Sequence, residues 1–180
     1  MRLRIQGEWL DYELGFFRDV AHSLDVTLDD FEEVARANSA LADDLDYPLR
    51  HEHIVGMGLV AAQLYLVSVA AEHAVSRKQA LSVEPRHSSG VPLAELINHG
   101  ANLWKHADEW NWDAPEPRQA RTMLAFGKVG ISDDDLSLYQ LLVQVTGLSR
   151  PRLMDVAPIL EQWHNSLDAM FPEKPGNAQP

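Results

Sequence analysis

The sequence of 180 residues contains no cysteine. This absence excludes disulfide bonds, thiolate catalysis and zinc sites built on cysteine ligands. It is also compatible with a reducing compartment, and we expect a cytoplasmic protein. The N-terminal segment, MRLRIQGEWLDYELGFF, carries charges where the apolar core of a signal peptide would have to lie. We therefore expect no secretory signal.

The sequence also lacks internal repeats, low-complexity runs and any sustained alternation of apolar and polar residues. Without that alternation we expect no sheet. Hydrophobic residues make up 46% of the chain, which is enough for a packed core. We predict an all-α fold, an up-and-down bundle of five to six helices. Residues 1–172 would form this single domain, and residues 173–180 a flexible C-terminal tail.

Basic residues are scarce: 15 Lys and Arg stand against 27 Asp and Glu, for a net charge of −12. An acidic protein repels phosphate backbones, so nucleic acid is a disfavoured partner, although the charge alone does not exclude it. Eight acids lie between Asp25 and Asp46, where Arg36 is the single base. Such a run is typical of a solvated helix face, and a docking surface for a basic partner is the alternative.

Only one long apolar stretch is present, from Ile54 to Ala71. It is about as long as a membrane span, but it contains Gln63 and Ser68. We interpret it as the buried central helix of the bundle, and we expect no membrane partner. Histidines and glutamates flank it, in an arrangement typical of helix ends that extend towards solvent (His51, Glu52, His53, Glu72 and His73). The two ends would be roughly 30 Å apart, so these residues cannot form one site.

Prolines, glycines and capping residues divide the chain into segments of helical periodicity. The loop Ser82–Pro92 separates the first three from the rest. The expected helices are Trp9–Ser23, a second from an N-cap at Thr27 to Leu45 before Pro48, His51–Lys78, Pro92–Trp110, the short Arg118–Phe126, one from a cap at Ser132 to Gly147, and a last one from Ser149 to Met170.

The Pro92–Trp110 helix has two different faces. A helical wheel puts Leu103 and Trp104 in the core, together with Leu93, Leu96, Ile97, Gly100 and Ala107. The opposite stripe consists of Glu95, Asn98, His99, Asn102, His106 and Glu109, with Lys105 to one side and Trp110 at its edge. Surface stripes are usually rich in Lys, Glu and Arg, whereas asparagine and histidine are able to form hydrogen-bonded networks. The stripe is therefore either a plain solvated face or a binding surface.

The segment Ala101-Asn102-Leu103-Trp104-Lys105-His106 resembles the RNxxxH motif of HEPN domains, which are small helical bundles. It is also similar to an ANxxKHxxEW pattern of bacterial helical proteins. In HEPN ribonucleases the motif meets across a homodimer interface and cleaves RNA without a metal. The resemblance implies catalytic roles for Asn102 and His106. However, Ala101 replaces the arginine that stabilises charge on the phosphate, so the resemblance implies a catalytically silent relative.

A metal site is another interpretation of the stripe, because Glu95, His99, His106 and Glu109 have spacings that can align ligands. A di-iron bundle would need two Glu-x-x-His pairs, and the chain has one, Glu161 and His164. We predict no metal and no cofactor. The predicted function is a non-enzymatic binding module that acts as a homodimer or with a protein partner. A metal-independent ribonuclease using His106 and Asn102 and a His/Glu metal-binding bundle are the alternatives.

Overall fold

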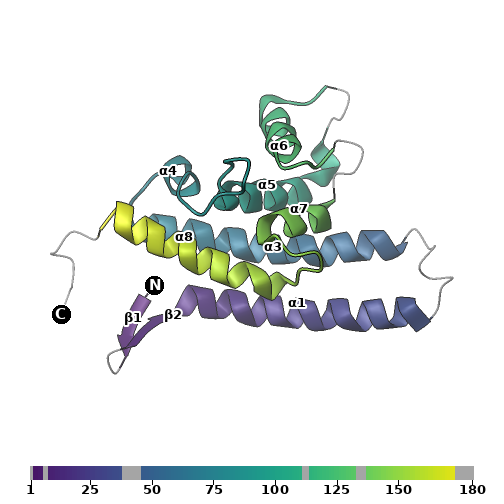
Figure 1. The fold of residues 1–180 in the computed structure, drawn as a ribbon, viewed down its shortest axis with the longest axis horizontal. Helices are drawn as coiled ribbons and strands as arrows, with labels where there is room; N and C mark the ends of the chain where they lie inside the picture. The colour runs from purple at the N-terminus through teal and green to yellow at the C-terminus, as the bar shows by residue number, and fades with distance from the viewer. Residues whose placement is uncertain (1, 6–7, 38–45, 111–113, 133–136, 173–180) are drawn as a thin grey trace.

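The computed structural model describes residues 2–5, 8–37, 46–110, 114–132 and 137–172. These residues form seven α-helices, which confirms the predicted all-α bundle. The long helices α1 (Tyr12–Ala37), α3 (Asp46–Glu72) and α8 (Ala157–Met170) pack side by side (Figure 1). Above α3 lie α5 (Leu93–Lys105) and α7 (Leu138–Thr146), and α6 (Pro117–Lys128) covers α5. The predicted tail, 173–180, lies outside the described residues.

A short β-hairpin precedes the bundle and is a local exception to the expectation of no sheet. Strands β1 (Arg2–Ile5) and β2 (Glu8–Asp11) pair antiparallel, with Leu3 opposite Leu10. The sequence signal is the alternation of Arg2, Leu3, Arg4 and Ile5, which is only four residues long. Strand β2 leads directly into α1, where the carboxylate of Asp11 accepts a hydrogen bond from the backbone N–H of Leu14 at 3.0 Å. That cap sets the helix start at Tyr12 rather than Trp9.

Helix α1 is continuous where two helices were expected. Thr27 does not cap a second helix, because its hydroxyl donates to the carbonyl of Ser23 inside α1, at 3.0 Å. Asp25 is buried, and it accepts hydrogen bonds from the backbone N–H groups of Leu153 and Met154 at 2.8 and 2.9 Å. These two residues begin the 3₁₀ turn η3 (Leu153–Val156) that leads into α8. Asp25 therefore acts as a cap for a segment far along the chain.

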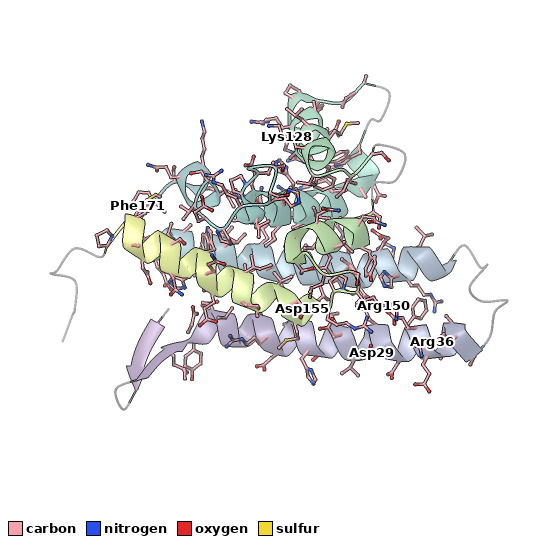
Figure 2. All side chains as sticks on the ribbon, viewed as in Figure 1. Asp29, Arg36, Lys128, Arg150, Asp155 and Phe171 are labelled. Atoms are coloured by element: carbon pink, nitrogen blue, oxygen red, sulfur yellow. The ribbon has the colours of Figure 1, made fainter. Side chains whose placement is uncertain are left out.

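The acidic run on α1 is used partly within the molecule. Arg152 donates to Glu32 at 2.9 Å and also contacts Asp29. Figure 2 shows that the segment from Arg150 to Asp155 lies beside Asp29 of α1. The hydrogen bond from Arg152 lowers the pKa of Glu32 below its ordinary value. The run is therefore not simply a solvated face, since these acids hold the approach to α8 in place.

Helix α3 is the central helix of the bundle, as its apolar composition indicates. Its segment Leu49–Glu72 is long and apolar enough to cross a membrane by length and composition, with a mean hydropathy of 2.0 over its most apolar window. In that window 61% of the residues are buried, which is the pattern of a core helix. It contacts α1, α5, α7 and α8. Pro48 lies in its first turn, where a missing N–H is tolerated, rather than ending a helix before it.

Three other helix boundaries differ from expectation, and at one of them, α7, a cap comes from a side chain distant in sequence. Helix α3 stops at Glu72 rather than at the expected Lys78, and α4 (Arg77–Leu81) begins separately with a capping box between Ser76 and Gln79. Helix α7 is capped by Ser137 rather than Ser132, and Glu52 of α3 also accepts from its first N–H groups. The expected first turn at 133–135 lies outside the described residues. Helix α8 begins at Ala157, after η3, rather than at a Ser149 cap.

Candidate functional site

Helix α5 is not the surface helix that its wheel predicts. Ala94 and Ala101 are buried although they lie outside the expected core face, and Asn98 of the polar stripe is only 8% exposed. Leu103 is in the core as predicted, but Trp104 is half-buried. The Trp104 indole lies over Gly56 of α3, where a Cβ would overlap the ring, and its Nε1 donates to Nδ1 of His53 at 3.1 Å. The helix is enclosed by α3 on one side and α6 on the other.

The polar stripe is divided between these two neighbours. Towards α6, Nδ1 of His99 lies 2.7 Å from the hydroxyl oxygen of Thr122, and Nε2 of His99 lies 3.6 Å from a carboxylate oxygen of Glu95. Burial lowers the pKa of His99, which favours the neutral ring at neutral pH. These contacts make His99 a packing residue between α5 and α6.

Towards α3, the stripe forms a network around Gln63. The Gln63 amide nitrogen donates to the side-chain oxygens of Asn98 at 2.8 Å and of Asn102 at 3.1 Å. Lys105 donates to the Gln63 amide oxygen at 2.6 Å, and Arg77 of α4 contacts the Asn98 side-chain oxygen. The network satisfies a buried amide in the middle of the most apolar helix. It also places two cationic side chains at one edge of α3.

The residues proposed for ribonuclease chemistry do not form a catalytic arrangement within one chain. Helix α5 ends at Lys105, so His106 leaves the helix, and its Nδ1 lies 3.1 Å from Glu109 in the turn η1 (Ala107–Glu109). Ala101, at the position of the arginine in the HEPN motif, is fully buried. Arg86, in the loop before α5, donates to Glu84 and to loop carbonyls. A phosphate at His106 would therefore lack a nearby cation from these residues.

Nor do the stripe residues converge on a metal. Among the described residues, the groups with metal-ligand geometry do not include Glu95, His99, His106 or Glu109. Trp110, at the end of the stripe, packs half-buried against the core. Gln119 of α6 donates to the backbone carbonyl of Glu109 at 3.2 Å, which fastens this end of α5 to α6.

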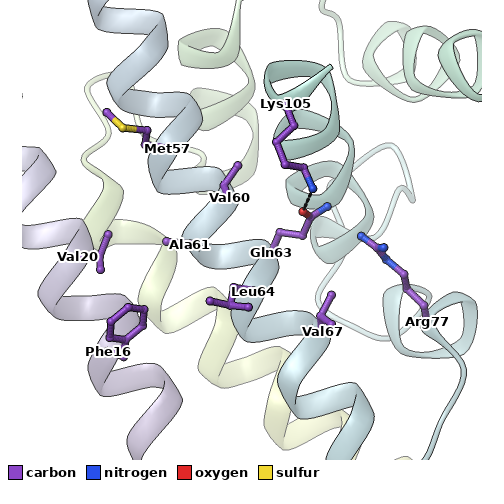
Figure 3. A pocket seen from close by; sticks show the side chains of 10 residues that line it. All are labelled: Phe16, Val20, Met57, Val60, Ala61, Gln63, Leu64, Val67, Arg77 and Lys105. Atoms are coloured by element: carbon purple, nitrogen blue, oxygen red, sulfur yellow. Dashed lines mark hydrogen bonds between the residues drawn. The ribbon is translucent and has the colours of Figure 1, made fainter. Parts of the chain in front are cut away.

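A groove of about 490 Å³ lies beside the Gln63 network, on the surface formed by α1 and α3. Figure 3 shows its lining, which is apolar along α1 and α3 and cationic on the side of α4 and α5. We call this surface the α1–α3 groove, and its lining residues are Phe16, Val20, Met57, Val60, Ala61, Gln63, Leu64, Val67, Arg77 and Lys105. Four of its large apolar side chains are strongly exposed: Phe16 (54%), Met57 (41%), Leu64 (51%) and Val67 (42%).

The cationic side of the α1–α3 groove is unusual in so acidic a protein. Neither Lys105 nor Arg77 forms an ion pair with a carboxylate in the part of the chain that the structure describes. Burial lowers the pKa of Lys105, and the nearby charges of Arg77 and Arg118 lower it further. An anionic group seated beside Lys105 would therefore offset the repulsion from Arg77 and Arg118 and raise the pKa of Lys105 again. The groove is suited to an apolar group that carries a negative charge.

Sequence reasoning identified Lys105 and the asparagines but missed the rest of the α1–α3 groove. Gln63 was recognised only as a polar interruption of an apolar stretch, although a lone amide in such a stretch needs partners. The sequence pattern puts Arg77 inside the expected helix His51–Lys78, whereas it begins α4. The exposure of Phe16 and Leu64 could not be predicted, because the sequence alone does not distinguish an exposed apolar residue from a buried one.

In comparisons with known proteins, no family model, no curated protein and no solved structure matches this chain.

Proposed function

We propose that the protein is a non-enzymatic interaction module, related in type to HEPN domains, that acts as a homodimer through the α1–α3 groove. The observation that carries this proposal is the contiguous exposed apolar strip formed by Phe16, Met57, Leu64 and Val67. Contiguous apolar patches on a soluble surface mark sites of association, whereas single exposed apolar residues do not. The buried alanine at the position of the motif arginine supports a binding role over catalysis.

The arrangement of charge around the strip favours a second copy of this chain as the occupant. One side of the groove carries Lys105 and Arg77, and the other side is α1, where Glu13 and Asp19 lie one helical turn on either side of Phe16. A twofold axis through the strip would place α3 against α3 and bring the cations of one copy over α1 of the other. Both copies would then use the same patch, with opposite charges facing each other. The patch would therefore be complementary to itself, as an isologous interface requires.

The first prediction concerns the centre of this interface. Leu64→Glu should convert a dimer into a monomer at micromolar concentration, because the new carboxylate would be buried against apolar side chains. We expect the dissociation constant to rise at least about tenfold, as for a central interface residue. Light scattering coupled to size-exclusion chromatography measures the change.

The matched control is Leu124→Glu. Leu124 is also an exposed helical leucine, at 61% against 51% for Leu64, but it lies on α6 away from the α1–α3 groove. This variant should remain dimeric. A wild-type protein that stays monomeric at high micromolar concentration would refute the homodimer, and a dimer that survives Leu64→Glu would place the interface elsewhere.

The second prediction concerns the cationic side of the groove. Lys105→Glu should weaken the dimer, and adding Asp19→Lys to it should restore part of the lost affinity, because the exchange re-forms an attractive pair across the axis. Raising the salt concentration should weaken the wild-type dimer in the same direction. Sedimentation equilibrium of the two variants tests the arrangement. If the double variant is weaker than Lys105→Glu, the proposed twofold arrangement is wrong.

The third prediction is that the protein does not cleave RNA in the absence of metal. The reaction needs a proton-transfer group and a cation beside the same phosphate. Restoring the motif by Ala101→Arg is not a usable control, because that side chain is buried and an arginine would disrupt the core. His106→Ala is the usable control, since His106 lies at the helix end. Wild-type cleavage that disappears in His106→Ala would contradict the non-enzymatic proposal.

A further inference from the structure

A cluster of potential metal ligands lies at the end of the bundle opposite to His106, where α3 and α8 both terminate. It consists of His73, in the turn after α3, and of His164 and Asp168, one turn apart on α8. One ligand atom from each residue lies within 4.8 Å of the other two. We call these residues the HHD cluster. The two imidazole rings are nearly perpendicular, at 85°, with centroids 5.8 Å apart.

The nitrogen atoms that face the carboxylate are the Nε2 atoms of both histidines. Nε2 of His73 lies 3.1 Å from Oδ1 of Asp168, and Nε2 of His164 lies 3.7 Å from the same oxygen. In a tetrahedral zinc site with bonds of about 2.0–2.2 Å, neighbouring ligand atoms are about 3.3–3.6 Å apart. The two distances lie close to that spacing, so small side-chain rotations would bring the three atoms onto one ion.

The opposite ring nitrogen of each histidine is held by an oxygen of the protein. Nδ1 of His73 lies 3.3 Å from the backbone carbonyl of Phe171. Nδ1 of His164 lies 2.9 Å from a carboxylate oxygen of Asp11, which also accepts a hydrogen bond from the hydroxyl of Tyr65 at 2.7 Å. A carbonyl and a carboxylate only accept, so each Nδ1 can donate a hydrogen to its oxygen. The hydroxyl of Tyr65 also lies 2.6 Å from Nδ1 of His164. A metal ion bound at Nε2 would keep the hydrogen of each ring on Nδ1, where these acceptors lie.

Metal-binding histidines are usually oriented by this kind of outer hydrogen bond to a carbonyl or a carboxylate. Both imidazoles are also shielded, with side-chain exposures of 6% for His73 and 3% for His164. The Asp168 side chain is 40% exposed among the described residues, so an ion would reach the cluster from this side. A water would supply the fourth ligand of a tetrahedral ion.

We propose that His73, His164 and Asp168 bind a divalent transition-metal ion, with Zn²⁺ as the best-suited ion. Two imidazoles and one carboxylate match the ligand preference of Zn²⁺ and Co²⁺, whereas Mg²⁺ and Ca²⁺ require mostly oxygen ligands. The site lies apart from the α5 stripe and is independent of the homodimer. The bound ion would join the ends of α3 and α8, and through Asp11 it would also hold the hairpin.

Calorimetry on the full-length protein tests this proposal, after treatment with a chelator and its removal. Titration with ZnCl₂ at neutral pH should show one ion bound per chain and should raise the melting temperature, because the ion binds only the folded state. Titration with CoCl₂ should produce the strong visible absorption of tetrahedral Co²⁺. Both Asp168→Asn and His73→Gln should weaken zinc binding at least about tenfold, since each removes one ligand.

The control is His22→Gln, which removes an exposed histidine of α1 outside the HHD cluster. It should bind zinc as the wild type does. Far-ultraviolet circular dichroism and melting of each metal-free variant show whether it still folds, and Asp168→Asn is the variant least able to disturb the core. If the wild type binds no zinc, or if neither ligand variant weakens binding, the cluster is only a hydrogen-bonded network around Asp168 and the proposal is wrong.

Discussion

Trp163→Ala should lower the free energy of unfolding by about 3–5 kcal/mol, as expected for a large buried aromatic residue. The Trp163 side chain is 1% exposed, and it packs against Tyr65 at a ring-centroid distance of 6.1 Å. Its Nε1 donates to the backbone carbonyl of Ala80 at 2.8 Å. Truncation therefore creates a cavity between α3 and α8 and removes one of the two hydrogen bonds that this carbonyl accepts, the other coming from the N–H of Val83 at 3.3 Å. Urea denaturation measured by circular dichroism gives the difference.

The comparison that makes this prediction specific is Trp104→Ala. The sequence pattern predicts Trp104 as a core residue, but its side chain is half-buried and covers Gly56 at the edge of the bundle. Its loss should therefore cost clearly less stability than the loss of Trp163. If Trp104→Ala lowers the free energy of unfolding as much as Trp163→Ala or more, Trp104 is a core residue and α5 packs more closely against α3 than described above.

The all-α fold could be predicted because each long segment repeats its apolar residues at helical spacing, and this signal is local. The boundaries were less predictable, because several of them depend on partners distant in sequence. Glu52 caps α7 from 86 residues away, and Asp25 caps η3 from 128 residues away. In a single sequence both acids look like ordinary charged residues on a helix surface. The helix start expected at Thr27 is absent for the same reason. Acids of this region contact the distant segment 152–154 instead of marking the first turn of a helix.

The candidate sites were less predictable than the fold. The unusual composition of the stripe on α5 did indicate a polar network, and Asn98, Asn102 and Lys105 do belong to one. The wheel could not show that α3 and α6 cover opposite edges of that stripe. His73 was interpreted as a helix-end residue that extends to solvent, but its side chain is almost fully buried. Its position depends on how α8 passes the end of α3, which is a tertiary feature.

Asp25→Ala should have the second large effect on stability. The carboxylate accepts from the N–H groups of Leu153 and Met154, and Leu153 is fully buried. Each buried donor that loses its acceptor costs about 1–3 kcal/mol, so we expect a loss of at least about 2 kcal/mol in the free energy of unfolding. Asp25→Asn keeps one acceptor oxygen and should lie between wild type and Asp25→Ala. Asp30→Ala, at an exposed position of the same helix, should change stability by less than about 0.5 kcal/mol.

The difference in stability between wild type and Asp25→Ala should decrease as the pH rises. Burial raises the pKa of Asp25 above its ordinary value of 3.8, because the hydrogen bonds from Met154 and Leu153 offset the loss of hydration only in part. Between the ordinary and the raised pKa the folded state binds more protons than the unfolded state, so the contribution of this carboxyl group falls as the pH rises. The difference in unfolding free energy between wild type and Asp25→Ala should therefore be largest below pH 3.8 and should narrow above it. A difference that grows with pH over this range would show that hydrogen bonding to the ionised carboxylate outweighs its burial.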